Sequence, residues 1–387
     1  MKTVLFDLLY SQPEGGIKYH GGGEYIKRIF RELALNYLDR IELIVYYDHS
    51  AFLDDWVKEI IREKDIEVLD IKKPADITQV LKERDIDVFY TGMCYQYNKA
   101  MFTDEVYTIG TFHGMRGAEC PHDEFEYKYM SGKQQYKEML RWYLKNTKRY
   151  GYGKAAENAV ESFMSCISSF DKLICDSEHT AFSLKNYYPE LDTESIDIIY
   201  PPLKYSESIY PGHLKEKFLL AIGGNRWVKN TYRALKALDD LYSRGHLKGV
   251  KSVIVGSVPA SIIKEIKCRD NFRFVGYIED DKLAALYRDC EAFIYPTLNE
   301  GFGYPPLEAM RFGTTCIVSA VCSLPEICGE AVYFVNPLDV GEIQNRILHA
   351  IDRKLDSEKV KNQFERIKRR QETDLEKLCM YICTGRP

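Results

Sequence analysis

The sequence predicts an α/β protein made of two doubly wound domains on either side of a cleft. Three observations lead to this fold class. The chain has 387 residues, enough for about two or three domains of ordinary size. Short β-rich runs alternate with helical stretches in two successive series, which is typical of parallel sheets covered by helices on both faces. A polar passage that contains prolines separates the two series and ends near residue 215.

The first series spans residues 1–205 and predicts one domain. A long helical region rich in tyrosine and lysine, at 118–169, breaks the alternation and is expected to form an inserted arm. Helices are expected at 24–38, 54–63 and 77–84. The expected strands of this domain cover residues 3–9, 41–47, 66–69, 88–92, 107–112 and 172–175.

The second series spans residues 206–365 and predicts the other domain. A charged helix over 342–378 follows it. Since ligands of doubly wound sheets bind at the carboxyl ends of the strands, we expect the site there. The expected helices cover residues 230–242, 262–267, 282–288 and 306–311. The expected strands cover residues 218–222, 251–256, 272–275, 292–295, 315–319 and 331–335.

Composition and charge argue against several classes of protein. The formal net charge of −5 gives no reason to expect nucleic acid as a partner. The first apolar run contains Asp7, so we expect a first strand rather than a signal peptide. No run approaches the ~18 apolar residues of a membrane span. Eleven cysteines without secretory features predict reduced thiols and a cytoplasmic location. The spacing of Cys316, Cys322 and Cys328 predicts buried structural thiols rather than a metal cluster.

Several ligand-binding motifs are missing or weak. Gly21–Gly23 is followed by Ile26 where the dinucleotide fingerprint needs glycine, and no Walker loop occurs. Asp85 and Asp87 match the Asp-x-Asp metal signature of some sugar transferases. They stand at the end of a charged helix, where aspartate is common. We therefore expect neither a metal nor a bound cofactor.

The most informative segment is Pro296-Thr-Leu-Asn-Glu-Gly-Phe-Gly-Tyr-Pro-Pro-Leu-Glu-Ala-Met310. It predicts a buried strand, a tight glycine turn, and a helix with proline in its first turn. Glycines let a backbone approach a ligand closely, and a helix N-terminus offers N–H groups to an anion. Glu300 and Glu308 bracket the turn and can accept hydrogen bonds from hydroxyl groups. The segment predicts a ligand that combines a sugar, phosphate and ribose.

This segment, with Asp281–Pro296 before it and Phe312–Pro337 after it, resembles the signature of family-4 retaining glycosyltransferases. The resemblance is specific over residues 218–340 and moderate over the N-terminal half. It implies the GT-B fold, in which two Rossmann-like domains enclose the active site. The N-terminal domain, 1–205, would then face the acceptor, and 206–365 would bind the nucleotide-sugar donor. The C-terminal helix, at 366–387, would cross back to the first domain.

The resemblance implies roles for the glycine turn. Glu300 would contact the hydroxyl groups of the donor sugar, and Glu308 would hold those of the ribose. The family usually has leucine at the position of Tyr304, a departure that can alter the sugar pocket. The backbone contacts to sugar and phosphate would come from Gly301, Phe302, Gly303 and Tyr304.

A second segment, Leu220–Asn230, resembles the family's strand and loop that supply two cations to the pyrophosphate. Lys229 fits one of them. Gly224 stands where the family has its arginine, and Arg226 follows two residues later. Either Arg226 reaches the phosphate from a shifted loop, or the site relies on Lys229 alone. Solvated loop residues are the alternative for both cations.

In the N-terminal half, Gly15-Gly16 and Gly21–Gly23 predict a glycine-rich loop between the first strand and the first helix. The resemblance places such a loop, here with Gly22 and Gly23, over the donor phosphates; a flexible surface loop is the alternative. The resemblance makes His113, which ends a strand and precedes a glycine, the active-site histidine beside the donor sugar. A structural role is the alternative. Ser177 and Glu178 resemble the family's Ser-Glu pair before a helix. A role of Ser177 as the helix cap explains this serine as well as a ligand contact does.

The family suggests a retaining transfer without a metal. Lys229, Arg226 and the helix N-terminus after Gly303 would stabilise the departing nucleoside diphosphate. The acceptor hydroxyl would attack from the side of the leaving group. A double displacement would instead need a carboxylate nucleophile, for which the sequence offers no obvious candidate.

The arm is expected to select the acceptor. Met139, Leu140, Tyr143 and Leu144 form an apolar stripe, with basic residues on other faces. Such a helix can touch anionic lipid and a lipid-linked acceptor, which would be a peripheral contact at the inner face of the membrane. The alternative is a helix packed on its own domain. The basic residues of the stretch are Lys137, Arg141, Lys145 and Lys148.

The sequence thus predicts a metal-independent, retaining hexosyltransferase. It would move a hexose from a nucleotide-diphosphate sugar to a hydroxyl of a glycan or lipid-linked acceptor, in the synthesis of a cell-surface polysaccharide or glycolipid. A GT-B sugar epimerase is one alternative, although it would need an acid/base pair at the sugar. A nucleotide-sugar-binding protein without turnover is the other, supported by the glycine at position 224. The absent glycine fingerprint disfavours a dinucleotide oxidoreductase.

Overall fold

The computed structural model describes residues 1–13, 20–147, 151–203, 209–214 and 216–386, and the side chains of 141–147 and 151–154 lie outside this description. The chain forms two compact units. Unit 1 comprises Met1–Met115, Asn158–Leu203 and Arg369–Pro387. Unit 2 comprises Arg116–Glu157 and Lys204–Lys368. The first part of the helical arm therefore belongs to unit 2 by its contacts.

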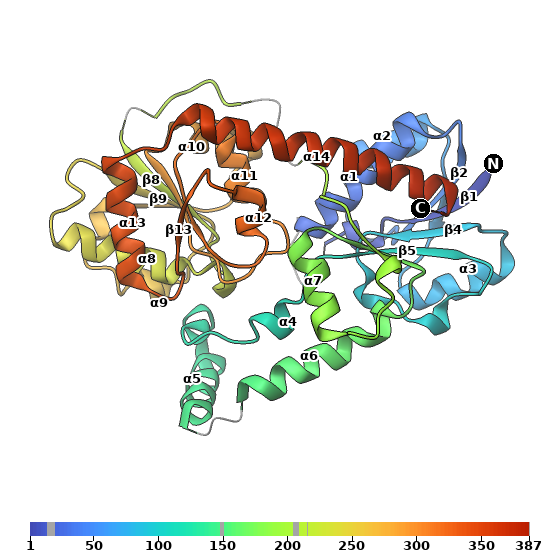
Figure 1. Cartoon of the computed structure of the whole chain (residues 1–387), viewed down its shortest axis with the longest axis horizontal. Coiled ribbons are helices and arrows are strands. Elements are labelled where there is room, and N and C mark those ends of the chain that lie inside the picture. The colour runs from blue at the N-terminus through green and yellow to red at the C-terminus, as the bar shows by residue number, and fades with distance from the viewer. Residues whose placement is uncertain (14–19, 148–150, 204–208, 215, 387) are drawn as a thin grey trace. The chain divides into compact units, whose positions relative to one another are not determined.

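Unit 1 is built on a seven-stranded parallel sheet with the order β3-β2-β1-β4-β5-β6-β7 (Figure 1). Its inner strands are continuous apolar runs because helices cover both faces. The sequence did not predict the last strand, which has only three residues and an aspartate in the middle. The strands are β1 (Lys2–Asp7), β2 (Ile41–Tyr47), β3 (Glu67–Asp70), β4 (Val88–Thr91), β5 (Tyr107–Phe112), β6 (Lys172–Cys175) and β7 (Ile196–Ile198).

The helices of unit 1 form its core with the sheet. The apolar faces of α1 (Gly21–Asn36) and α2 (Asp55–Glu63) pack on β1 and β2. The end of α14 (Ser357–Thr384) joins the same core through residues that include Leu378 and Ile382. The other helices of this unit are α3 (Ile77–Glu83), the larger part of α6 (Gly151–Ile167) and α7 (Glu178–Tyr187).

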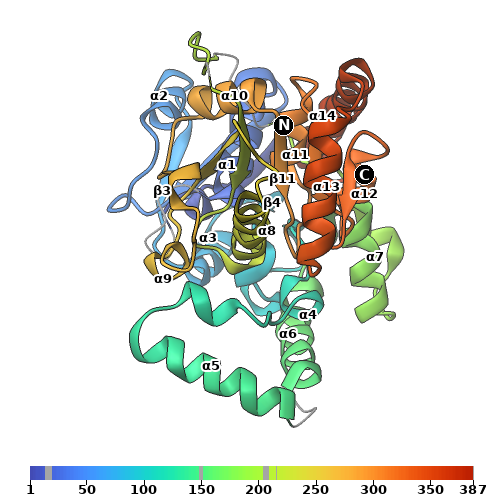
Figure 2. The ribbon, with the colours of Figure 1, turned by 90° about the vertical axis from the view of Figure 1, so that its left-hand side faces the viewer.

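Unit 2 contains a six-stranded parallel sheet with the order β10-β9-β8-β11-β12-β13. The helices α8 (Thr231–Ser243) and α13 (Val340–Asp352) lie side by side on one face and bury their apolar sides against it (Figures 1 and 2). The strands are β8 (Phe218–Ile222), β9 (Lys251–Val255), β10 (Phe272–Val275), β11 (Ala292–Tyr295), β12 (Cys316–Ser319) and β13 (Tyr333–Val335). The remaining helices are α9 (Ala260–Ile263), α10 (Asp280–Asp289), α11 (Tyr304–Met310) and α12 (Leu324–Cys328).

The arm begins with α4 (Arg116–Glu119) and a short 3-10 helix, η5 (Glu126–Tyr129). It continues in α5 (Gly132–Thr147), drawn in teal, which packs on η5 (Figure 2). Within the described ranges, no helix combines the length and the apolar character needed to cross a membrane.

The prediction of a single charged helix over 342–378 is wrong. The chain forms α13 and α14 there, separated by residues 353–356. The break has a tertiary cause, because the Leu355 N–H donates to Thr315 Oγ1 at 3.1 Å. Asp356 then caps the next helix by accepting from the Glu358 N–H at 2.9 Å.

Candidate functional site

The sheet of unit 2 has a topological switch point between β8 and β11. The two strands pair in parallel, and the chain continues from them to opposite edges of the sheet. Ligands of doubly wound sheets bind at this place, outside the carboxyl ends of the strands. The loop after β8 carries Arg226 and Lys229, and the loop after β11 carries Glu300. The fold thus brings three of the four charged residues predicted in this half of the chain to the carboxyl ends of these two strands, and Glu308 lies on α11.

Lys229 and Glu300 form an ion pair across the switch point, with side chains that are 14% and 11% exposed. Lys229 Nζ also lies 2.7 Å from the hydroxyl of Tyr295, the last residue of β11, and that hydroxyl donates to Glu300 Oε1. Thr297 Oγ1 lies 3.1 Å from the same oxygen. Three donors therefore converge on Oε1, while no described residue donates to Oε2.

The charges around this pair are not balanced. Burial raises the pKa of the Glu300 carboxyl, but the ammonium group of Lys229 outweighs this effect, and the net pKa lies below its ordinary value. Burial lowers the pKa of Lys229; Glu300 opposes the shift, while the positive charges of Arg226 and Arg116 add to it. The positive charges of Arg226 and Arg116 therefore both act on Lys229. Fixed cations at such a place can stabilise an anionic group of a ligand.

The loop after β8 explains why no arginine stands at position 224. Gly224 has a φ of +53°, and a Cβ there would lie 2.6 Å from the backbone nitrogen of Ser257. Only glycine fits such a close approach of two backbones. Arg226 follows on the exposed part of the loop, and its charge reaches both Lys229 and Glu300. That Arg226 takes the place of the family arginine stays a prediction.

The glycine turn follows Glu300. Gly303, with a φ of +108°, is the residue before α11, and Phe302 is buried. Ser323 fixes the turn by donating to the Phe302 carbonyl at 2.8 Å. The rings of Phe302 and Tyr304 lie edge to face, with centroids 5.2 Å apart. Gly301 precedes this pair of aromatic residues in the same turn.

Glu308 lies half-buried on α11, facing Tyr287 of α10. Burial, followed by the nearby Glu308 carboxylate, raises the pKa of the Tyr287 hydroxyl well above its ordinary value. Tyr287 therefore stays protonated at neutral pH. The structure places Glu308 on the helix that follows the turn, as the sequence pattern predicts, and its role toward ribose stays a prediction.

The structure adds residues that the sequence did not indicate. Tyr295 looks like an ordinary strand residue, but its hydroxyl joins Lys229 and Glu300. Glu119 of α4 accepts a hydrogen bond from Nδ2 of Asn299, the residue directly before Glu300, at 2.7 Å. Arg116 begins the same short helix and is exposed. The only sign of Arg116 in the sequence is its place three residues after His113, at the end of a strand. That sign does not distinguish it from an ordinary surface arginine.

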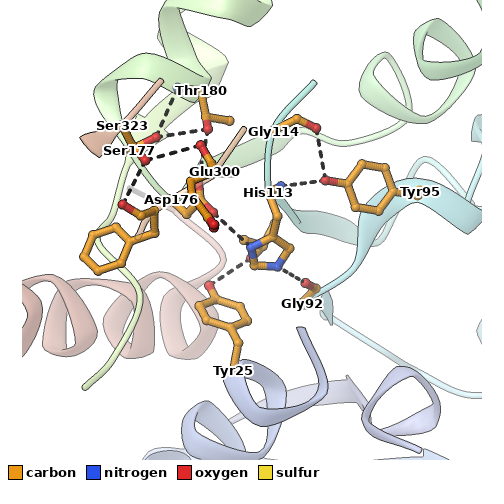
Figure 3. A network of polar contacts seen from close by, with 12 residues as sticks. Tyr25, Gly92, Tyr95, His113, Gly114, Asp176, Ser177, Thr180, Glu300 and Ser323 are labelled. Atoms are coloured by element: carbon orange, nitrogen blue, oxygen red, sulfur yellow. Dashed lines mark hydrogen bonds and ion pairs between the residues drawn. The ribbon is translucent and has the colours of Figure 1, made fainter. Parts of the chain in front are cut away.

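Unit 1 holds the predicted histidine. His113 follows β5; its Nδ1 lies 3.3 Å from Asp176 Oδ2 and its Nε2 lies 2.8 Å from the Gly92 carbonyl (Figure 3). The ring of Tyr25 meets the imidazole edge to face, with centroids 4.9 Å apart. The Tyr95 hydroxyl accepts from the His113 N–H at 2.7 Å. Both ring nitrogens thus have partners within the unit, and a catalytic role for His113 stays a prediction.

The sequence predicted a loop for Gly21–Gly23, but these glycines form the start of α1. Gly22 and Gly23 lie in the first turn of α1, and Gly23 N donates to the ring of the capping residue, His20, at 3.1 Å. A Cβ at Gly22 would come within 2.5 Å of Met93 Sδ. The Met93 side chain would have to move to admit a larger residue at 22. Gly15 and Gly16 lie outside the described residues, and contacts of Gly22 and Gly23 with a donor remain predictions.

Comparisons with known proteins find similarity to glycosyltransferases. Residues 209–370 match the family model of glycosyl transferases group 1. A serotype-specific mannosyltransferase of Escherichia coli, WbdA, is 47% identical over 76 residues, which are 20% of this chain and 9% of that protein. The O-antigen chain mannosyltransferase RfbU of Salmonella typhimurium is 29% identical over 160 residues, 41% of this chain and 44% of that protein. The matched segments thus span less than half the length of these relatives.

Solved structures extend the likeness to the whole chain. The Anabaena protein HepE, crystallised with UDP, aligns with a TM-score of 0.65 over 99% of both chains at 15% sequence identity. WaaG, a glycosyltransferase involved in lipopolysaccharide biosynthesis, aligns with a TM-score of 0.59 over 100% of both chains at 16% identity. The predicted GT-B fold and the resemblance to group 1 glycosyltransferases are confirmed.

Proposed function

We propose that this chain, whose residues 209–370 form a group 1 glycosyltransferase domain, transfers a hexose from a nucleotide-diphosphate sugar to a hydroxyl of a glycan or lipid-linked acceptor. The observation that carries the proposal is the Lys229–Glu300 pair at the switch point of unit 2, with Arg226 beside it. The mannosyltransferase names of its relatives support a role in the synthesis of a cell-surface polysaccharide.

The charges of the site suit the departure of a nucleoside diphosphate. Lys229 and Arg226 provide fixed positive charge where negative charge develops on the leaving group. Glu300 is held by its Oε1, so its Oε2 is oriented to accept from a hydroxyl of the donor sugar. Lys229 would therefore bind the diphosphate of the donor, and Glu300 would bind its sugar.

We assign the reaction a retaining course without a metal. The cations already supply the charge that a metal ion would provide to the diphosphate. Asp85 and Asp87 precede β4, at the edge of the sheet opposite the carboxyl ends, and Asp87 accepts from the Thr3 N–H at 2.8 Å. Asp87 is thus engaged at this edge of its own sheet. NMR of the first-formed product tests retention, since an inverted anomer would contradict it.

The arm supports a lipid-linked acceptor. Tyr136, Met139 and Leu140 of α5 lie three and four residues apart and are 71%, 42% and 56% exposed, with exposed Lys133 and Lys137 beside them. A basic helix with an exposed apolar side binds anionic lipid surfaces. Sedimentation with phosphatidylglycerol vesicles tests this part. Binding that is lost in Met139→Ser/Leu140→Ser supports it, and a wild-type protein that stays in the supernatant contradicts it.

A donor screen tests the proposed reaction. The protein is mixed with UDP-, GDP-, dTDP- and ADP-sugars in EDTA, and thermal stabilisation and slow donor hydrolysis are followed. We expect one donor to stabilise the protein and to be hydrolysed. Glu300→Gln, which keeps the shape and removes the charge, should slow hydrolysis by about 10²-fold.

The matched control is Glu330→Ala, which removes a glutamate of the same unit whose side chain is 91% exposed. It should leave hydrolysis unchanged. Stabilisation by a donor without turnover, even after acceptor glycans are added, would favour a binding protein. A product with an altered sugar and no transfer would favour an epimerase.

A further inference from the structure

The first part of the arm is built into unit 2 by one arginine. Arg233 of α8 is 2% exposed, and its Nη2 lies 2.9 Å from Asp123 Oδ2 and 2.8 Å from Glu124 Oε1. Its guanidinium also covers the ring of Phe125 at 4.5 Å. A buried guanidinium with two carboxylates holds its partners in one geometry, because breaking such a pair leaves an uncompensated charge. Residues 123–125 are therefore fixed on α8.

The same arginine connects the arm to the cation loop. Arg233 Nη1 donates to Asn230 Oδ1 at 2.9 Å, and Asn230 directly follows Lys229. Asn230 is itself buried and donates to the carbonyl groups of Pro296 and Pro337 at 2.8 and 2.7 Å. The position of the arm and the position of Lys229 are thus set by one network.

A second contact connects the arm to the loop that holds the carboxylate. Glu119 Oε2, at the end of α4, lies 2.7 Å from Asn299 Nδ2, and Asn299 directly precedes Glu300. The arm is therefore attached next to both members of the Lys229–Glu300 pair. Glu119 attaches α4 directly, and Arg233 holds the segment that follows it, at 123–125.

Arg116 is the charged residue that α4 holds near the Lys229–Glu300 pair. It begins α4, so its backbone lies about 5 Å along the helix axis from that of Glu119. The side chain is exposed, and among the described residues nothing forms a hydrogen bond or ion pair with its guanidinium. Its charge nevertheless reaches Lys229. Arg116 thus adds a solvent-accessible positive charge that is available to an anion bound at Lys229.

We propose that Arg116 is a third diphosphate-binding cation of the donor site, supplied by the arm and held in place by the contacts Glu119–Asn299 and Arg233–Asp123. This inference rests on the proposed function, since it assumes a nucleoside diphosphate at Lys229. It makes the arm a part of the donor site as well as a candidate for acceptor binding.

Calorimetry with Arg116→Gln tests the inference. The probes are UDP, GDP, dTDP and ADP, with uridine, guanosine, thymidine and adenosine beside them. For the diphosphate that the wild-type protein binds, Arg116→Gln should weaken binding about tenfold, as expected for a charge-assisted hydrogen bond. Binding of the matching nucleoside should stay unchanged. The difference should shrink in 1 M salt, where screening acts over about 3 Å.

Arg244→Gln is the matched control, because Arg244 is an exposed arginine of unit 2 at the end of α8, and the change in net charge is the same. It should alter diphosphate affinity by less than about twofold at 0.15 M salt. Equal diphosphate affinity in wild type and Arg116→Gln would overturn the inference alone. A wild-type protein that binds none of the four diphosphates would overturn the proposed function and this inference together.

Discussion

The two units have the same strand order around their switch points but opposite chemistry at them. In unit 1, Asp7 at the end of β1 accepts from Thr91 of β4 at 2.7 Å, and both are fully buried. In unit 2, the pair across β8 and β11 is Lys229 and Glu300, with exposed arginines nearby. The first junction is closed by its own hydrogen bonds, and the second offers charge to a ligand. Topology thus gives the location of a site, and the side chains decide whether there is one.

The largest effect is expected for Lys229 of unit 2, whose side chain is 14% exposed. Lys229→Met should slow donor hydrolysis by about 10³-fold, because it removes the cation closest to the leaving group. Circular dichroism should show that the protein is still folded. Hydrolysis within tenfold of the wild-type rate would mean that the switch point of unit 2 is not the reaction centre.

Lys27→Met is the control in unit 1. Lys27 is 2% exposed and pairs with Glu24 at 2.5 Å and Asp54 at 2.6 Å. Its loss should cost about 3 kcal/mol or more of unfolding free energy, as breaking a buried ion pair does. The hydrolysis rate of the folded protein should remain unchanged. A large loss of rate here would remove the contrast between the units.

A smaller effect is expected where the loop after β8 approaches the neighbouring backbone. Gly224→Ala combines a left-handed φ with a clash at Ser257 N, and it should cost about 3 kcal/mol of stability. It should also weaken nucleotide affinity, since it displaces the loop of Lys229. Gly249→Ala is the control, because its φ of +75° is also left-handed but nothing lies within 4 Å. It should cost about 1 kcal/mol and leave affinity intact.

The free energy of unfolding should depend on pH through Asp7, the buried carboxyl at the switch point of unit 1. Burial raises the pKa of Asp7 from its ordinary 3.8 to about 6, against the hydrogen bonds from Thr91 and Tyr97. The folded protein therefore binds this proton more tightly than the unfolded chain, and the associated stability is lost as pH rises through 6. Urea unfolding of Asp7→Asn and wild type should show it. Their difference in unfolding free energy should change by about 2 kcal/mol between pH 4 and pH 7, with the wild type losing stability. A constant difference would contradict the assignment.

The smallest effect is expected for Arg226. It is exposed, so Arg226→Gln should weaken diphosphate binding about fivefold at low salt and less at high salt. Isothermal titration at two salt concentrations measures both. An unchanged affinity would mean that the shifted arginine does not replace the family arginine missing at Gly224.

Much of the fold was predictable because buried parallel strands are continuous apolar runs. The run Ala292–Tyr295 and the run Phe218–Ile222 were predicted with the bounds that the structure has. The short strand β7 and the break before α14 were missed. Both depend on tertiary partners, such as the Leu355–Thr315 hydrogen bond, that leave no periodic pattern in the sequence.

The site was predictable where a loop motif carries it. Lys229 and Glu300 stand in loops whose glycines and prolines have no use in an ordinary turn. Arg233 could not be found in this way, since it looks like any arginine of an amphipathic helix. Its partners Asp123 and Glu124 stand 110 and 109 positions away in the chain. No local spacing connects residues so far apart.

The buried Arg233 has a consequence for any exchange of the arm between proteins. An arm grafted from another protein would bring new residues to positions 123–125, and without two carboxylates there the guanidinium would be left buried and uncompensated. A modular design must therefore transplant α8 together with the arm, or replace Arg233 with an apolar residue of similar volume. The arm of this chain therefore cannot be exchanged by itself as an independent cassette.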